Sequence, residues 1–322
     1  MSAPRDVSVV IATLDRAASL ARCLDALFAG GDQPREVIVA DQSQGHESLH
    51  VVRERAARGW PIVHHALSGP GAARARNAAA RRASGAILAF TDDDCVPQPG
   101  WLGALVDAFD GPAGPAASTG RVLPLGEPEP GRYAVATRAS RATAEFRGRA
   151  LPWRAGTGGN LAVGRAWFER VGGWDERLGP GSGGLAGEDV DLIRRLLRAR
   201  GIVRYVPEAV VLHERHDERS YRRSRWTYGF GLGAAAGCWL REGDRLGALL
   251  LAAWAAERTR LLAGALVRRR WTAARSDARM ILGAIAGLPH GLALPAATGP
   301  AGRGPAAAEP PAAVRPGPGE RG

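Results

Sequence analysis

Short apolar segments alternate with longer segments of helical periodicity along the first hundred residues. Strands are predicted where β-branched and other apolar residues run together, at 7–12, 37–40, 62–64 and 87–90. Helices are predicted where apolar or alanine side chains recur at helical spacing, at 17–28, 47–58 and 71–84. This alternation is typical of a parallel sheet with helices on both faces. We therefore predict an α/β fold built on a doubly wound, mostly parallel sheet.

The pattern is weaker in the second half of the chain. We predict a strand at 160–163, a helix at 190–200 and two short strands at 203–206 and 210–213. The intervening segment is rich in Pro, Gly and Arg, and it predicts no firm element.

Composition divides the chain into three predicted parts. Residues 1–235 would form the α/β domain, and residues 236–288 a helical segment rich in Leu, Ala, Trp and Arg. Residues 289–322 are mostly Pro, Gly and Ala, a composition typical of a disordered tail.

The charge balance changes the range of expected partners. The 322 residues hold 43 basic and 32 acidic side chains, a net charge of +11, and every basic residue is Arg. Such a surplus favours anionic partners, among them phosphates and acidic lipid surfaces. The three cysteines, Cys23, Cys95 and Cys238, form no CxxC pair, which excludes a disulfide framework and fits a reducing compartment.

Hydropathy predicts a cytoplasmic protein. No signal-peptide core precedes the first strand, and the uncharged stretches are too short or too rich in proline for a spanning helix. Trp254, Trp271 and the Arg surplus predict that 246–288 forms two amphipathic helices on the inner face of the membrane. The alternative is a pair of helices that packs only on the α/β domain.

The strongest candidate for chemistry is an acidic run after the strand at 87–90. Asp92, Asp93 and Asp94 stand at the carboxyl end of that strand, where open α/β sheets bind ligands. Neighbouring carboxylates repel one another, so a hard divalent cation is their natural partner. A solvated acidic turn is the alternative. Asp41, at the end of another strand, would face the same crevice.

Two further segments carry candidate residues. Asp189 directly precedes a predicted helix and could take a proton from a hydroxyl, although an acidic side chain there could simply cap the helix. In YRRSRWTYGFG, Arg225 stands among aromatic side chains, a combination that binds phosphates and rings. An exposed basic turn is the alternative. His213 follows an apolar strand and is a candidate metal ligand or a structural residue.

Five segments, in order, resemble glycosyltransferase family 2, whose members are inverting, metal-dependent enzymes of the GT-A fold. The segments cover about two thirds of the chain and read VSVVIATLDR (7–16), VIVADQS (37–43), GPGAARARNAAARRASGAILAFTDDDCVPQPGWL (69–102), GGNLAVGRAWFERVGGWDE (158–176) and GEDVDLIRRLLRARG (187–201). The second segment ends in ADQS where many members have paired aspartates, so one nucleotide contact is in doubt.

The resemblance implies a role for each matching residue. The residues implied to bind the nucleotide sugar are Thr13, Asp15, Asp41, Arg76, Asp92 and Asp93. The residues implied to bind a Mg or Mn ion are Asp94, Asp92 and His213. Arg76 would lie near the base or the diphosphate. Asp189 would be the general base, supported by Glu188. The residues implied to form the sugar and acceptor pocket are Gly159, Asn160, Trp174, Arg225 and Trp226. Arg225 and His213 would also close on the diphosphate or the metal.

The predicted function is the metal-dependent, inverting transfer of one sugar from a nucleoside-diphosphate sugar to a hydroxyl acceptor. The acceptor could be a lipid-linked saccharide, in the synthesis of cell-surface polysaccharide or glycolipid, and no nucleic acid is expected. The alternatives are a metal-dependent nucleotidyltransferase and a non-catalytic basic binding module. A dinucleotide-dependent oxidoreductase is disfavoured because the first turn, ATLDRAAS, lacks the glycine fingerprint.

Overall fold

The computed structural model describes residues 5–111 and 114–296 of the chain. Within them one nine-stranded sheet forms, in the order β3-β2-β1-β4-β9-β6-β10-β5, with β8 on the far side of β10. Its strands are β1 (Arg5–Thr13), β2 (Pro34–Asp41), β3 (Ile62–Ala66), β4 (Ile87–Asp92), β5 (Cys95–Pro97), β6 (Ala117–Pro124), β8 (Ala144–Phe146), β9 (Asn160–Gly164) and β10 (Val203–His213).

Most strands of this sheet are parallel, as predicted. The pairs of β1 with β2 and β4, of β2 with β3, and of β6 with β10 are parallel, whereas β5, β8 and β9 pair antiparallel to their neighbours. A separate two-stranded sheet joins β7 (Arg132–Tyr133) to β11 (His216–Asp217). The predicted strands at 203–206 and 210–213 are one strand, because the irregularity between Val206 and Val210 shifts the register without ending the pairing.

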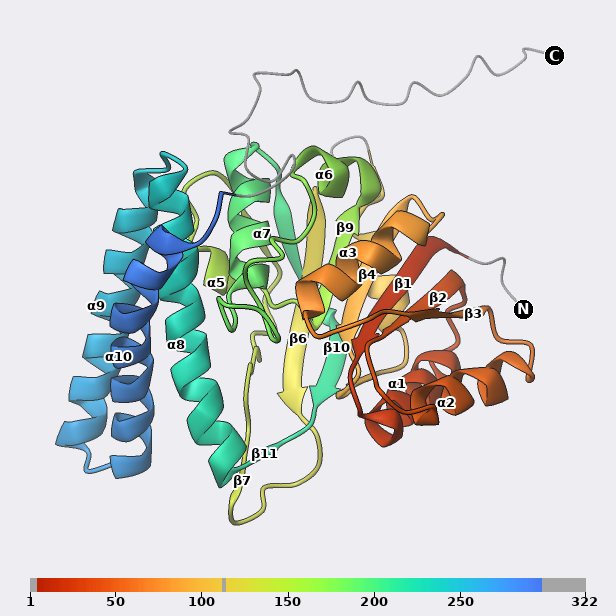
Figure 1. The fold of residues 1–322 in the computed structure, drawn as a ribbon, viewed down its shortest axis with the longest axis horizontal. Helices are drawn as coiled ribbons and strands as arrows, with labels where there is room; N and C mark the ends of the chain where they lie inside the picture. Colours follow the sequence, from red (N-terminus) through yellow and green to blue (C-terminus); the bar gives the residue numbers. More distant parts are fainter. Residues whose placement is uncertain (1–4, 112–113, 297–322) are drawn as a thin grey trace.

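Helices cover both faces of the sheet (Figure 1). They are α1 (Ala17–Ala29), α2 (Glu47–Ala56), α3 (Ala72–Arg82), α4 (Trp101–Asp107), α5 (Pro152–Ala155), α6 (Arg165–Arg170), α7 (Glu188–Arg198), α8 (Glu218–Arg241), α9 (Leu246–Val267) and α10 (Trp271–Ala293). Because side chains alternate along a strand, Val9 and Ile11 pack in one apolar core with α1 and α4, and Val10 packs in the opposite core with α3 and α7. The doubly wound prediction is confirmed.

The last three helices stand side by side at one flank of the sheet (Figure 1). The boundary predicted at residue 235 falls inside α8, and α10 continues through Pro289 to Ala293, beyond the predicted end at 288. Pro289 lies in the closing turns of α10, where its missing N–H removes a single helical hydrogen bond. The rest of the predicted tail, residues 297–322, lies outside the described residues.

Glycines at every fourth position hold α8 and α10 together. A Cβ atom on Gly229, Gly233 or Gly237 of α8 would lie 2.0, 2.2 or 2.5 Å from a carbonyl oxygen of α10. A Cβ atom on the matching glycines of α10, Gly287 and Gly291, would lie 2.0 Å from a carbonyl oxygen of α8. The two backbones can approach this closely only because these positions carry no side chain.

Gly287→Ala is therefore expected to destabilise the protein by about 1–3 kcal/mol, the usual cost of overpacking, although alanine is the better helix former. Urea unfolding measures the effect. The control is Gly264→Ala in α9, where the new Cβ would meet only the flexible end of Arg268 at 3.0 Å. The control should be neutral or stabilising, and equal effects of the two substitutions would contradict the close packing of α8 on α10.

Candidate active site

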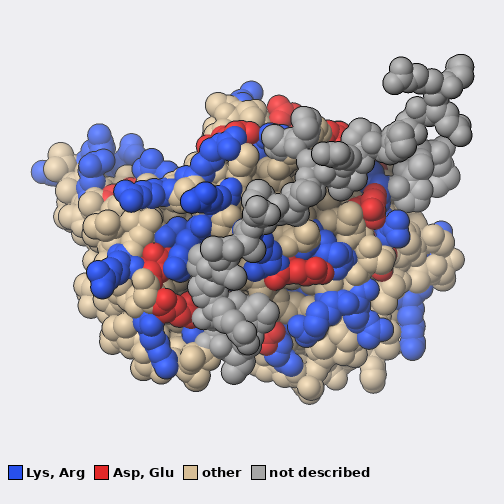
Figure 2. Space-filling model, turned by 90° about the horizontal axis from the view of Figure 1, so that it is seen from above, with Lys and Arg blue, Asp and Glu red and all other residues tan. Residues whose placement is uncertain are grey.

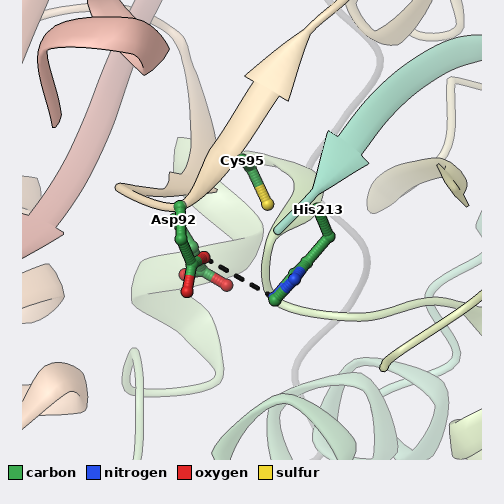
Figure 3. Close-up of side chains that lie close together, drawn as sticks. Asp92, Cys95 and His213 are labelled. Atoms are coloured by element: carbon green, nitrogen blue, oxygen red, sulfur yellow. Dashed lines mark ion pairs between the residues drawn. The ribbon is translucent and has the colours of Figure 1, made fainter. Parts of the chain in front are cut away.

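The carboxyl ends of β4 and β10 bring four potential metal ligands together. Asp92 ends β4, Asp94 lies in the turn after it, and Cys95 begins β5. His213 ends β10 and lies beside Cys95 in the antiparallel pairing. One ligand atom from each lies within 4.8 Å of the others. Figure 3 shows Asp92, Cys95 and His213 converging from these separate strands.

The donor set fits a divalent cation. Oδ1 of Asp94 is buried without a hydrogen-bond partner in the described part of the chain, and it lies 3.5 Å from Nε2 of His213. Two carboxylates and an imidazole are ligands that Mg²⁺ or Mn²⁺ accepts while keeping positions open for phosphate oxygens. Cys95 is the unforeseen member of this group, although it directly follows the acidic run in the sequence.

Asp93, the middle carboxylate, turns away from this group. It accepts hydrogen bonds from Oγ1 of Thr13 at 2.8 Å and from Nη1 of Arg16 at 3.2 Å. Burial, followed by repulsion from Asp94, raises the pKa of Asp93 to about 6. The hydroxyl of Thr13, which the sequence predicts to hold the nucleotide, thereby also fixes the turn after β4.

Arg76 links the metal group to the predicted base. Its guanidinium donates to Oδ1 of Asp92 at 2.5 Å and to Oε1 of Glu188 at 3.1 Å, and it lies 5.0 Å from the ring centroid of Trp174. Burial alone would lower the pKa of Arg76, but the two carboxylates raise it above its usual value. The structure buries Arg76 between two carboxylates, and its predicted place near the nucleotide stays a prediction.

The acidic pair at the start of α7 lies on the other side of Arg76. Asp189 is half-buried and accepts the backbone N–H groups of Gly158 at 3.1 Å and Val190 at 2.7 Å. Burial raises the pKa of Asp189 above the usual value, while these two hydrogen bonds lower it. Burial, together with the charge of Asp189, raises the pKa of Glu188 to about 7. The N-cap of α7 is Gly187, so Asp189 does not cap the helix.

Two residues predicted to line the sugar and acceptor pocket are buried structural residues. Asn160 accepts from the indole N–H of Trp101 at 2.9 Å and donates to backbone oxygens of β6 and β10 at 2.8 and 2.9 Å. Trp174 packs edge-on against Phe90, with 5.1 Å between the ring centroids. Both side chains lie in the interior, and their place in the sugar and acceptor pocket stays a prediction.

Gly159, in contrast, lies against the metal group. A Cβ atom at this position would be 2.7 Å from Oδ2 of Asp92, so any side chain would displace that carboxylate. The glycine at this position is therefore required by the geometry of Asp92, which the sequence pattern could not show.

Two predicted nucleotide residues lie at the ends of neighbouring strands, Asp15 in the turn after β1 and Asp41 as the last residue of β2. Asp41 accepts the N–H of Ser43 at 2.9 Å and lies 2.8 Å from Nε2 of His64. Asp15 adopts a positive φ of 53° and accepts the N–H of Gln44 at 3.2 Å, which ties the two turns together. His64 was not singled out in the sequence, because a histidine on a short edge strand carries no motif.

Arg225 and Trp226 lie on α8. The guanidinium of Arg225 lies between the rings of Tyr221 and Tyr228, at 5.0 and 4.8 Å from their centroids. Its Nε and Nη2 are buried without a hydrogen-bond partner in the described residues. Trp226 is exposed. An arginine held by two rings, with donors still free, is suited to bind an anion.

A family model described as "Glycosyl transferase family 2" matches residues 8–171, about half of the chain. The chain belongs to this family. The matched residues include the turn after β1, the acidic run and Gly159.

Curated relatives agree with this assignment. The pre-mycofactocin glycosyltransferases of two Mycobacterium tuberculosis strains, CDC 1551 / Oshkosh and H37Rv, are 29% identical over 260 residues. The match covers 77% of this chain and 50% of each relative, so the chain spans about half the length of these relatives.

Solved structures show the same fold. Mannosyltransferase PcManGT from Pyrobaculum calidifontis, in complex with GDP-Man and Mn²⁺, is 22% identical over 89% of both chains, with a TM-score of 0.59. S. aureus TarS 1–349 in complex with UDP-GlcNAc is 18% identical over 69% of the present chain and 65% of the TarS chain, with a TM-score of 0.51. These similarities confirm the predicted GT-A type architecture.

Proposed function

We propose that this protein moves one sugar from a nucleoside-diphosphate sugar to a hydroxyl acceptor, depends on a divalent metal and inverts the anomeric carbon. The observation that carries the proposal is the position of Arg76, which hydrogen-bonds Asp92 of the metal group and Glu188 beside the base Asp189. Metal ligands and base thereby belong to one connected site.

Asp92, Asp94 and His213 would hold the metal, which when bound supplies positive charge to the departing diphosphate. Asp189 takes the proton of the acceptor hydroxyl, and Gly158 and Val190 hold its carboxylate in place. Attack from the side of Asp189, opposite the leaving group, inverts the sugar carbon. Arg225 provides a further positive charge for the diphosphate, while Thr13, Asp15, Asp41 and Asp93 form the nucleotide side of the site.

Metal removal tests this proposal. With a panel of UDP-, GDP- and dTDP-sugars, we expect one donor to release nucleoside diphosphate in the presence of Mn²⁺, with EDTA and Asp94→Asn each reducing the rate at least about 100-fold. Exposed Asp110, which lies outside the metal group, provides the control Asp110→Asn with an unchanged rate. Metal-independent release, or release of inorganic diphosphate instead, would contradict the proposal.

We further propose that α9 and α10 dock on an anionic membrane surface at the cytoplasmic face, where the acceptor would belong to cell-surface polysaccharide or glycolipid synthesis. Eight of the twelve large apolar side chains that the described residues leave exposed lie on these two helices: Leu249, Leu261, Leu266, Val267, Trp271, Leu282, Ile285 and Leu292. Within the described ranges no helix has the length and apolar character that crossing a bilayer requires.

Charge supports the same surface. Residues 246–293 contain seven arginines and two acids, and both acids are paired, Glu257 with Arg154 and Asp277 with Arg258. Figure 2 shows basic side chains at the left edge of the molecule, where α9 and α10 lie in Figure 1. Apolar side chains among arginines that outnumber the acids suit the interface of an anionic leaflet.

Flotation with vesicles tests the docking. We expect the protein to float with vesicles that contain phosphatidylglycerol, and Val267→Glu combined with Ile285→Glu to reduce the bound fraction about tenfold. Both side chains are exposed, at 84% and 64%, so the fold should tolerate the changes. Vesicles of phosphatidylcholine alone are the control. A protein that stays entirely in the soluble fraction would refute the membrane surface.

A further inference from the structure

Arg138 lies at the active-site edge of the sheet without a motif to mark it. It is in the connection between β7 and β8, and its backbone pairs with Val122 of β6 through hydrogen bonds of 2.8 and 2.9 Å. Val122 is near the carboxyl end of β6, beyond Arg121, whose carbonyl oxygen holds Asn160 next to Gly159. The main chain therefore fixes Arg138 near the site independently of its side chain.

The guanidinium of Arg138 has no partner in the described part of the chain. It is half-buried, yet among residues 5–111 and 114–296 no hydrogen bond, ion pair or ring contact engages it. Burial lowers the pKa of Arg138, while the charges of Asp189 and Glu257 act in the opposite direction. A cation kept from water without a hydrogen bond costs free energy, and binding an anion would recover it.

The neighbouring acidic groups are already engaged. Glu257 accepts from the indole of Trp153 and from Arg154, each at 3.3 Å. Asp189 accepts two backbone N–H groups. The hydroxyl of Tyr205, which also lies close to Arg138, donates to the carbonyl oxygen of Ser140 at 2.9 Å. Within residues 5–111 and 114–296 no free acidic group therefore remains for Arg138, which favours a bound anion as its partner.

We propose that Arg138 binds an anionic group of the acceptor, a carboxylate or a phosphate. This inference rests on the proposed role of Asp189 as the base. Arg138 pairs with Val122, the neighbouring Arg121 holds Asn160, and Gly158, two residues before Asn160, donates its N–H to Asp189, which places the anion on the acceptor side. The donor diphosphate has its own cations at the metal group and Arg225. A planar guanidinium with free donors suits the paired oxygens of either anion.

Binding of small acidic probes tests the inference. Glucuronic acid and glucose 6-phosphate are titrated against glucose, with the side-chain Nε–H signals of ¹⁵N-arginine as the readout. We expect at least one acidic probe to bind the wild type about tenfold more tightly than glucose, as a charge-assisted hydrogen bond would give. Preference for glucuronic acid would identify a carboxylate, and preference for glucose 6-phosphate a phosphate. Equal binding of all three probes would overturn the inference.

Variants assign the binding to Arg138. Arg138→Gln should abolish the preference for the acidic probe, and Arg138→Lys should retain part of it. Exposed Arg141 in the same connection supplies the control Arg141→Gln, which should retain it fully. The preference should also survive Asp94→Asn, which removes donor turnover, so a failure of the transferase proposal remains separate. A preference that survives Arg138→Gln, or a loss of nucleotide binding in that variant, would overturn the inference.

Stability gives an independent readout. Because the Arg138 side chain forms no hydrogen bond with the described residues, Arg138→Gln should leave the midpoint of urea unfolding unchanged or higher. A structural arginine would lower it. A large decrease in the midpoint would therefore show that Arg138 stabilises the fold rather than binding an acceptor.

Discussion

Asp189→Asn is expected to lower kcat for sugar transfer by about 10²–10⁴-fold, the usual contribution of a general base, with little change in donor affinity. The amide keeps the shape of the side chain, and its oxygen can still accept the N–H of Gly158. It cannot take a proton from the acceptor. Steady-state kinetics with the donor identified by the panel measure kcat, and nucleotide titration measures donor affinity.

The pH profile provides a second observation on the same residue. The base must be ionised, and burial raises the pKa of Asp189, so the rate should fall as pH decreases through this raised value. Glu188 has a pKa of about 7 and interacts with Asp189. The decrease in rate at low pH therefore reports the ionisation of both carboxyl groups together and not of Asp189 alone. Retention of more than about a third of kcat in Asp189→Asn would place the base elsewhere.

Arg76→Met is expected to destabilise the protein by about 3–5 kcal/mol at neutral pH, because it leaves the carboxylates of Asp92 and Glu188 without their shared cation. Methionine fills a similar volume against Trp174, so lost packing contributes less than lost charge. Urea unfolding at two pH values measures the free energy. Activity should fall as well, since Asp92 loses a hydrogen bond that orients it.

The sign of the pH effect distinguishes this explanation from simple loss of packing. The pKa of Glu188 in the folded protein is already raised to about 7, and removing Arg76 raises it further. A raised carboxyl pKa favours the folded state at low pH, so the deficit of Arg76→Met should shrink at pH 5 and be largest near pH 8. A deficit of equal size at both pH values would contradict the electrostatic explanation.

The matched control is an ion pair at the surface. Arg58 pairs with Glu54 at 2.5 Å, and both side chains are more than half exposed, at 52% and 59%. Arg58→Met should cost less than about 1 kcal/mol, because solvent screens such a pair. The contrast between the two arginines therefore measures the effect of burial on the charge.

The sequence by itself determined the strand–helix order of the first hundred residues and the position of the acidic run. Apolar runs such as 7–12 are β-branched and short, so they form strands in many tertiary contexts. Asp92 and Asp94 follow such a strand directly, so their place at the sheet edge follows from the local pattern. The start of α7 at Glu188 and Asp189 also follows from the local sequence pattern.

Only the tertiary structure decided which polar residues are buried and what they contact. Arg76 and Glu188 are far apart in the sequence and meet across the site, whereas Asn160 and Trp174 lie in the core although their segment suggested a pocket. Arg138 stands in a segment without a clear pattern, and the pairing with β6 brings it to the site. Burial and charge pairing arise from contacts between distant segments, and the periodicity of a single segment carries no information about them.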